Sequence, residues 1–290
     1  MSSLMSELML VTTAGLVALP LASRRFRRAL RPNEHVRFNM ATMVAGLALL
    51  EAALLACAIP VLAGLWTSGS FGRHFFPGDT ASGWVSASLA IFVAGSVAVS
   101  AIRLRRAESR LRIESWIGFH EQREGYELVV LDLEQPLAYA VAGRCQQVVI
   151  TSGLAEGLSD AELDAVVAHE RAHLRLGHRR ALAVLAAAEA IARLARPLKR
   201  VVAAARFAIE HAADAATDDR AATRRALRKL GGVDVPAVVA AFTAGHVADR
   251  IHALSAPPKT TRGWRIRAGL YLAAAGMGTS SVAILVAYWI

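Results

Sequence analysis

The sequence has 290 residues, 55% of them hydrophobic, and its mean hydropathy is +0.40. A soluble domain has about half of its residues apolar, so the excess indicates that lipid surrounds part of the chain. The net charge of +10 comes with no nucleic-acid-reading motif, so we expect no nucleic-acid partner. Two cysteines are too few for a disulfide framework, and a metal site here must use histidine and carboxylate ligands.

Four segments are long and apolar enough to cross a bilayer as helices, which takes about 20 residues each. They are residues 4–22, 40–66, 84–102 and 268–290. In the first, the basic residues follow the apolar run, the reverse of a secretory signal peptide, so we interpret it as a retained anchor. Glu51 lies within the second; a carboxyl at that depth is either functional or protonated or hydrogen-bonded inside the helix bundle.

Arginine clusters predict how these segments are oriented. Six arginines lie in residues 23–38, and basic clusters also follow the third segment and precede the fourth. Cytoplasmic loops carry an excess of Lys and Arg, so we expect both chain ends outside the plasma membrane. The expected organisation is a three-span region at 1–102, a cytoplasmic domain at 103–266 and a fourth span at 267–290.

Within residues 103–266 the pattern predicts both helices and strands. The runs 126–133 and 146–151 are rich in Val, Ile and Tyr, as β-strands are. Ser159 and Glu162 form a capping box, which predicts the start of a helix that reaches about residue 177. Further helices are expected at 103–118 and 200–229, and the apolar stretch 181–192 is too short to cross a bilayer.

The helix that begins after Ser159 carries His169-Glu-Arg-Ala-His173, an HExxH motif. At 100° per residue, His169 and His173 lie about 40° apart on one helix face, so both imidazoles can reach one tetrahedral Zn²⁺. Glu170 follows His169 directly and so lies about 100° further round the helix, where it can take a proton from water on the metal. The alternative is a surface helix with two incidental histidines, which the capped helical context disfavours.

A catalytic zinc needs a third protein ligand. After His173 the chain has two glutamates, Glu189 and Glu210. Glu210 stands one helical turn before Asp214, so Glu210 can bind the metal while Asp214 holds a histidine ligand from behind. Glu189 lies in an alanine-rich run without such a partner. We therefore prefer Glu210, the alternative being that it is a solvated residue on a helix face, and expect one Zn²⁺ per chain.

Two further histidines lie near these residues in the sequence. His178 would point about 180° from His169 if the helix continued, so we interpret it as an exposed residue at the helix end. His211 is expected to be a neighbour of the site. We expect neither to be a ligand.

The HExxH motif, followed by the ExxxD motif of Glu210 and Asp214, resembles the HtpX/CAAX-protease class of membrane zinc peptidases. The form His169-Glu-Arg-Ala-His173, with three spans before it and one after, more closely resembles the BlaR/MecR-type sensor peptidases. The resemblance implies a mainly α membrane protein, with four transmembrane helices and a cytoplasmic α+β zincin-like metallopeptidase domain. It also implies endopeptidase activity and Glu210 as the third ligand.

The sequence departs from these families in three places. Leu137-Ala-Tyr139 stands where the HtpX class has an Asn-Ala-Phe-like element on the substrate-binding edge strand, so that Asn is missing. The downstream His-Pro…Arg-Ile element is matched by His246-Val-Ala-Asp-Arg250-Ile, in which His246 either stabilises the tetrahedral intermediate or is an exposed helix-cap residue. We expect no penicillin-binding sensor after the fourth span, so the resemblance does not imply antibiotic sensing.

We therefore expect an integral membrane zinc endopeptidase, in which His169, His173 and Glu210 hold the zinc. Glu170 would pass the proton to the leaving amine, and the substrate would pair with an edge strand near 137–141. The expected substrate is a cytoplasmic or membrane-associated protein in regulatory signalling, with a cytoplasmic transcriptional regulator as the candidate. Two alternatives stay open: a quality-control protease for membrane proteins, and a non-catalytic sensor or scaffold, against which the intact Glu170 argues.

Overall fold

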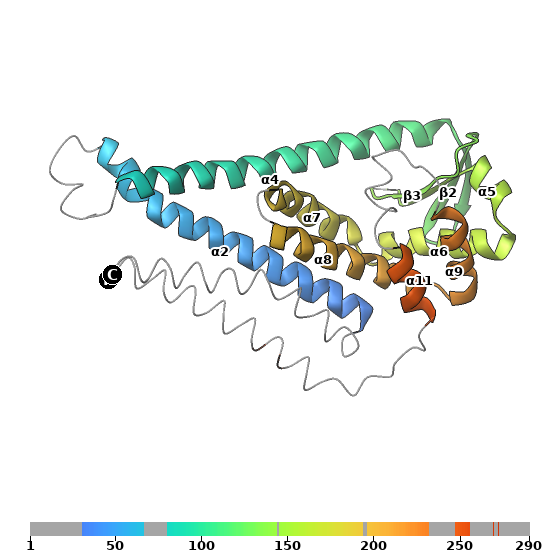
Figure 1. The fold of residues 1–290 in the computed structure, drawn as a ribbon. Coiled ribbons are helices and arrows are strands. Elements are labelled where there is room, and N and C mark those ends of the chain that lie inside the picture. The colour runs from blue at the N-terminus through green and yellow to red at the C-terminus, as the bar shows by residue number, and fades with distance from the viewer. Residues whose placement is uncertain are drawn as a thin grey trace.

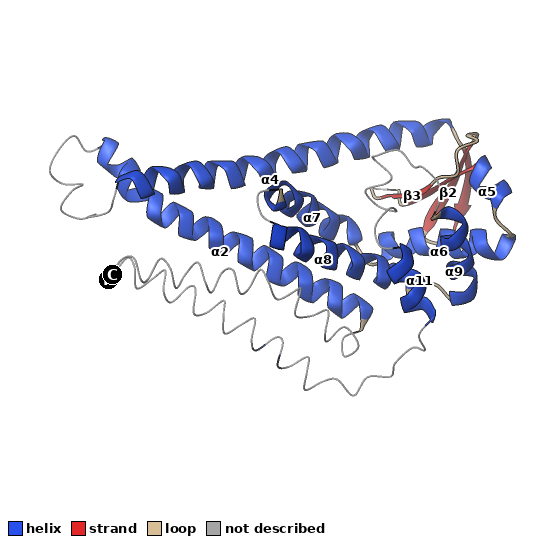
Figure 2. Cartoon of the chain, in the orientation of Figure 1, coloured by secondary structure: helices blue, strands red, loops and turns tan. Residues whose placement is uncertain are grey.

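The computed structural model describes residues 31–66, 80–143, 145–193, 196–231 and 247–255, together with Gly269 and Leu272. The expected span at 4–22 lies outside these residues. Of the expected span at 268–290, the structure describes only Gly269 and Leu272. The described part is elongated and mainly helical, with one small mixed sheet at one end (Figures 1 and 2). The prediction of a mainly α chain with an α+β portion is confirmed for the described residues, which are mostly helical and contain one small mixed sheet.

Two long helices, α2 (Pro32–Trp66) and α4 (Thr80–Glu114), run along the molecule and converge at one end (Figure 1). By length and composition each contains a candidate membrane span, Pro32–Leu55 in α2 and Trp84–Arg112 in α4. They overlap the second and third spans predicted from the sequence. The described residues therefore hold two candidate spans, where the sequence predicts four in the whole chain.

Helix α4 runs without a break past residue 102, where the sequence suggested a boundary. The helix expected at 103–118 is the continuation of α4 to Glu114, followed by one 3₁₀ turn, η1 (Ser115–Ile117). Residues 103–114 include no Pro or Gly that could end a helix. The change from apolar to arginine-rich sequence thus alters the surroundings of the helix, not its backbone.

A four-stranded sheet follows α4. Its strands are β1 (Phe119–Arg123), β2 (Tyr126–Leu131), β3 (Ala138–Val141) and β4 (Gln147–Thr151), in the order β1-β2-β4-β3. β2 and β4 are parallel, and the edge strands β1 and β3 pair antiparallel with them. The two predicted strands and the edge strand near 137–141 are confirmed. β1 was not predicted because all its residues are exposed and show no apolar alternation.

The sheet is covered on both faces. One face packs against α5 (Ser152–Gly157) and α6 (Asp160–Arg175) through Tyr126, Leu128, Val148, Ile150, Leu154, Leu158 and Val167. On the other face Val129, Leu131, Tyr139, Val141 and Val149 form a cluster with Leu111 of α4. β4 is buried along its whole length as a result. The sheet thus holds α6 at a fixed distance from α4.

The start of α6 is fixed by the predicted capping box. Ser159 donates its backbone N–H to Glu162 at 3.1 Å, and the Ser159 side chain accepts in return. Glu162 also accepts from Lys229 of α9 (Arg220–Leu230) at 2.7 Å. The bond from Lys229, followed by that from Ser159, lowers the pKa of Glu162 to about 2. The N-terminus of α6 is therefore joined to α9 as well as to the sheet.

Helices α7 (His178–Ala192) and α8 (Arg196–Asp214) lie between α2 and α4 (Figure 1). The apolar stretch 181–192 lies in α7, where Leu185 packs with Val36 and Met43 of α2 in one core. Ile191 packs with Leu54 of α2 and with Ala90 and Val93 of α4. The stretch that is too short to cross a bilayer thus joins the two candidate spans to the rest of the structure.

The helical run expected at 200–229 is two helices, not one. α8 ends at Asp214 and α9 begins after Asp219, whose side chain accepts from the backbone N–H groups of Ala221 and Ala222 at 2.8 Å each. This N-cap lets the chain turn between the helices. A last described helix, α11 (Val247–Ser255), packs against both.

Candidate metal centre

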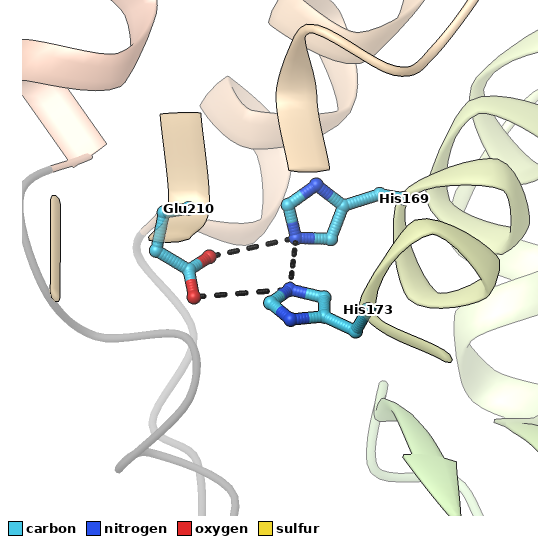
Figure 3. Close-up of side chains that lie close together, drawn as sticks. All are labelled: His169, His173 and Glu210. Carbon is cyan, nitrogen blue, oxygen red and sulfur yellow. Dashed lines mark hydrogen bonds and ion pairs between the residues drawn. The ribbon is translucent and has the colours of Figure 1, made fainter. Parts of the chain in front are cut away.

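Three side chains able to bind a metal meet between α6 and α8 (Figure 3). They are His169, His173 and Glu210, and their ligand atoms all lie within 4.8 Å of one another. His169 Nε2 is 3.1 Å from His173 Nε2 and 3.4 Å from Glu210 Oε2. His173 Nε2 is 3.8 Å from Glu210 Oε1. The side chains are nearly buried, with exposed fractions of 10%, 10% and 3%.

This geometry fits a zinc ion. Tetrahedral Zn²⁺ with nitrogen and oxygen ligands at about 2.1 Å places those atoms about 3.4 Å apart. The two imidazole nitrogens are 3.1 Å apart, and each lies 3.4 or 3.8 Å from a different oxygen of the Glu210 carboxylate, which is close to that value. Within the part of the chain that the structure describes, neither buried oxygen of Glu210 accepts a hydrogen bond, although Oε2 forms an ion pair with Arg250. A buried carboxylate needs such a partner or a cation nearby, and the donor set of two imidazoles and a carboxylate suits zinc.

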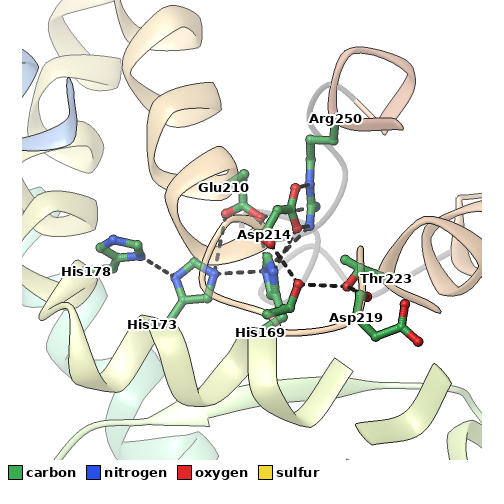
Figure 4. Close-up of polar contacts among 9 residues, drawn as sticks. His169, His173, His178, Glu210, Asp214, Asp219, Thr223 and Arg250 are labelled. Carbon is green, nitrogen blue, oxygen red and sulfur yellow. Dashed lines mark hydrogen bonds and ion pairs between the residues drawn. The ribbon is translucent and has the colours of Figure 1, made fainter. Parts of the chain in front are cut away.

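Charged groups stand behind His169 (Figure 4). Its Nδ1 lies 2.9 Å from Oδ1 of the buried Asp214. Arg250 of α11 donates to both oxygens of Asp214, from Nε at 2.8 Å and from Nη2 at 2.7 Å. The same guanidinium places Nη1 3.1 Å from Glu210 Oε2. One buried cation therefore pairs with two buried carboxylates and offsets part of their charge.

These contacts move the pKa values of both acids downward. Burial alone would raise the pKa of Glu210, but the charge of Arg250 and the contact with His169 lower it to about 2. Burial likewise opposes ionisation of Asp214, and bonds from Arg250 and His169 hold the pKa of that carboxyl well below its usual range. Both side chains are thus ionised at neutral pH, as a metal ligand and its partner should be.

A neutral histidine stands behind His173. His178 Nδ1 lies 3.1 Å from His173 Nδ1, and only 1% of His178 is exposed. The prediction that His178 is an exposed residue at a helix end is therefore wrong. α6 ends at Arg175, and Gly177 has a left-handed φ of +66°, so the chain turns and α7 begins with His178 directed back to the site. Helical periodicity places His178 on the far side only if α6 continues past Gly177, which it does not.

The two ligand histidines consequently differ in charge. For His169, burial would lower the pKa, but the bonds with Asp214 and Glu210 outweigh it and raise the pKa to about 9. For His173, burial lowers the pKa to about 3. His173 is therefore a neutral imidazole throughout the physiological range, whereas His169 must lose a proton before its Nε2 can bind a metal.

Glu170 lies beside the ligands and borders a cavity together with His173. Burial raises the pKa of Glu170 to about 7, and a hydrogen bond with the backbone of Ala140 partly offsets this. A carboxyl with such a pKa can both accept and release a proton near neutral pH. Ala140 belongs to β3, which contacts α6. A peptide strand added along β3 would therefore pass Glu170 and the metal ligands.

The other residues weighed from the sequence lie elsewhere. Glu189, the rejected alternative ligand, forms an ion pair with Arg206 of α8 and is no member of the ligand cluster. His211 stacks on Phe207, with ring centroids 5.8 Å apart, and is likewise outside the cluster. His246 lies outside the described residues.

Sequence reasoning did not identify Arg250 and His178 as members of the centre. Arg250 belongs to the element that begins at His246, and nothing in the spacing of that element indicates an ion pair with Asp214, 36 residues earlier. For His178 the available signal was the preceding Gly177, because glycine commonly ends a helix with a left-handed turn.

Residues 102–229 match the model of Peptidase family M48. Searches of curated proteins and of solved structures found no match. The matched region contains the sheet, the HExxH helix and Glu210. It supports the resemblance to HtpX-like zinc metallopeptidases and makes no BlaR/MecR-type assignment. Residues 102–229 are therefore similar to peptidase family M48, and the chain is a zinc metallopeptidase, with His169, His173 and Glu210 as its metal-binding triad.

Proposed function

We propose that the chain is an integral membrane endopeptidase that cleaves a cytoplasmic or membrane-associated protein. The observation that carries this proposal is the placement of the buried triad and Glu170 beside β3, an edge strand of the sheet that the structure describes. An edge strand offers backbone groups to an extended chain of any sequence. Such an edge suits cleavage within a polypeptide.

The residues divide the reaction among them. His169, His173 and Glu210 would hold the zinc, which would supply a Lewis acid for the scissile carbonyl and for the attacking water. Glu170 takes the proton of the attacking water on its carboxylate and delivers it to the leaving amine. Asp214 and His178 fix the ring orientations of His169 and His173, so that both Nε2 atoms point to one place. His246, which the structure does not describe, is proposed to stabilise the tetrahedral intermediate.

The membrane part of the proposal rests on the surface of α4. Its large apolar side chains are exposed along the candidate span: Trp84, Val85, Leu89, Ile91, Phe92, Val97, Val99 and Ile102. Such a continuous apolar surface is unusual in water and ordinary in lipid. This surface supports the span in α4. From the arginine clusters and the apolar runs of the sequence we propose four spans, with residues 103–266 in the cytoplasm between a region at 1–102 and a last span at 267–290.

For the biological role we propose regulatory signalling, with a cytoplasmic transcriptional regulator as the candidate substrate. Support comes from the form of the His169-Glu-Arg-Ala-His173 motif and from the order of the spans. A quality-control protease for membrane proteins would use the same active site. A non-catalytic scaffold would need no carboxyl with a pKa near 7 beside the triad.

Cleavage is tested with the purified full-length protein in detergent and an unfolded protein as substrate. We expect activity that a zinc chelator removes and added zinc restores. Glu170→Gln should lower the rate by about 10²–10⁴-fold because it removes the proton acceptor. The variant must still bind one zinc per chain, which shows that the fold is intact. Equal cleavage by both proteins would contradict the assignment of Glu170.

The role is tested by proteomics of cells that express the wild type or Glu170→Gln. One soluble regulator cut at a single place only with the wild type would support signalling. Fragments of many membrane proteins, increasing under membrane stress, would instead identify quality control.

Orientation is tested with the native Cys145, which is exposed and unpaired. A membrane-impermeant maleimide should label Cys145 only after intact cells are permeabilised. Cys145→Ser provides the background from the second cysteine, Cys57. Labelling of Cys145 in intact cells would contradict a cytoplasmic active site.

A further inference from the structure

A cavity of about 110 Å³ opens directly beside the metal centre. Glu170 and His173 border it on the side of the site, so a side chain in the cavity would belong to a residue near the cleaved bond. The other walls are mostly apolar: Leu104 and Leu111 of α4, Val141 of β3, Leu174 of α6 and Leu182 of α7. Figure 1 shows α4 passing along β3 and α7, which bring these residues together.

We infer that this cavity is a specificity pocket that receives one large apolar side chain of the substrate, on the amino-terminal side of the cleaved bond. The inference rests on the proposed peptidase function. It adds the class of side chain that is recognised and the residues that recognise it.

The size of the cavity sets the class of side chain. A water molecule needs about 10–15 Å³ on the same measure, and an apolar cavity of about 150 Å³ holds benzene. A cavity of about 110 Å³ therefore suits a side chain of the size of Leu or Phe. The walls are prepared for it, because Leu111, Leu174 and Leu182 are half-buried and would lose contact with water when the pocket fills.

The charges at the cavity favour an apolar occupant too. Glu108 of α4 and Arg179 of α7 both line it, and they form a two-bond ion pair with distances of 2.5 and 2.6 Å. Each neutralises the other. A charged substrate side chain would have to break this pair to gain a partner, whereas an apolar one leaves it intact.

The direction of β3 places the pocket relative to the cleaved bond. β3 runs from Ala138 to Val141, and the cavity lies along Tyr139, Ala140 and Val141 and extends past Ala140 to Ala142. A substrate strand antiparallel to β3, the more stable pairing, would meet Ala142 first and then Ala140, whose backbone contacts Glu170. The residue in the pocket therefore precedes the bond that is cut.

The test uses the purified, zinc-loaded full-length protein and peptides that differ at one position. Leu, Phe, Ala or Glu is placed at each of the two positions before the cleaved bond and at the first position after it, and kcat/KM is measured. We expect Leu or Phe to exceed Ala and Glu by about 10–200-fold at one position before the bond, the range for an apolar pocket. The position after the bond should show no such preference.

Leu182→Trp fills the pocket and should lower the ratio of kcat/KM for the Leu and Ala peptides at least tenfold. The matched control is Leu133→Trp, the same substitution at a side chain that is 48% exposed and outside the cavity. It should keep the wild-type ratio. Zinc content and melting temperature verify that each variant is folded. Leu111→Trp fills the pocket from α4 and replaces Leu182→Trp if the latter does not fold.

Equal cleavage of all peptides, a preference confined to the position after the bond, or an unchanged ratio in a folded pocket-filling variant would overturn the inference. Cleavage of none of the peptides and of no unfolded protein by zinc-loaded wild type would overturn the proposed function as well. The two failures are thus distinguished by whether the wild type cuts anything.

Discussion

The two histidines of the metal centre are held in opposite ways, although they lie one turn apart on α6. His169 is backed by charge, from Asp214 and its partner Arg250. His173 is backed by the neutral His178, only five residues along the chain. Arg250 is 81 residues from His169. One side of the centre therefore depends on tertiary assembly of three helices, and the other on a single turn at Gly177.

Glu210 contacts both His169 and His173, so its removal should have the largest effect on zinc binding. Glu210→Ala takes away one of three zinc ligands and should abolish stoichiometric zinc binding and cleavage. Zinc content of the purified protein measures this. Glu189→Ala is the matched control, since Glu189 pairs with Arg206 away from the cluster, and should leave both properties nearly unchanged. The reverse ranking would mean a ligand set with shorter spacing.

On the charged side, Asp214→Ala should lower zinc affinity by about 10–100-fold. The substitution frees the His169 ring and leaves Arg250 buried beside Glu210 alone, so it should also destabilise the fold by about 3–5 kcal/mol. Competition with a zinc chelator and chemical unfolding measure the two effects. Asp218→Ala, at an exposed carboxyl in the next turn, should change neither. Equal effects of both variants would contradict a specific role for Asp214.

The opposite pKa shifts predict how zinc binding depends on pH. His169, with its pKa raised to about 9, is protonated at pH 6, whereas His173, with its pKa lowered to about 3, is not. Zinc must displace the proton of His169, so affinity should rise about tenfold per pH unit until His169 loses its proton on its own. Calorimetry at pH 6 in buffers of different ionisation enthalpy should find about one proton released per zinc. Asp214→Asn should reduce that number.

At His178, the neutral residue behind His173, we expect the smallest effect on zinc affinity. His178→Leu removes the acceptor for the Nδ1–H of His173 and should lower zinc affinity by about tenfold, the lower end of the range for such partners. His178→Gln keeps an acceptor of similar reach and should stay within a few-fold of the wild type. Chelator competition measures both. If His178→Leu and His178→Gln weaken zinc binding equally, His178 supports the site by packing and not by accepting a hydrogen bond.

The same comparison shows what the sequence could reveal. His169, Glu170 and His173 follow from spacing on one helix, and Glu210 with Asp214 from spacing on another, because helical geometry fixes which side chains share a face. The capping box at Ser159 is also local, and the structure confirms it. Patterns within single elements therefore identified the ligand residues, and the choice of Glu210 also rested on the presence of only two glutamates after His173 and on the family resemblance.

Contacts between elements were not predictable in this way. His178 was misplaced because a left-handed glycine changed the direction of the chain, and periodicity assumes that direction is constant. The run 200–229 was read as one helix because the cap at Asp219 follows a turn without Pro or Gly. The continuity of α4 was missed because a change in polarity was taken for a break in the backbone.

Helix α4 has a mechanical consequence for an enzyme with one end of this helix in a bilayer. From Trp84 in the candidate span to Leu111 at the cavity, the helix rises about 40 Å at about 1.5 Å per residue. A tilt of about 5°, well inside the range by which bilayer thickness tilts helices, would displace Leu111 by about 3.5 Å. That displacement is comparable to the width of a methyl group. Lipid composition would then alter which side chains the pocket admits, with no ligand bound near the active site.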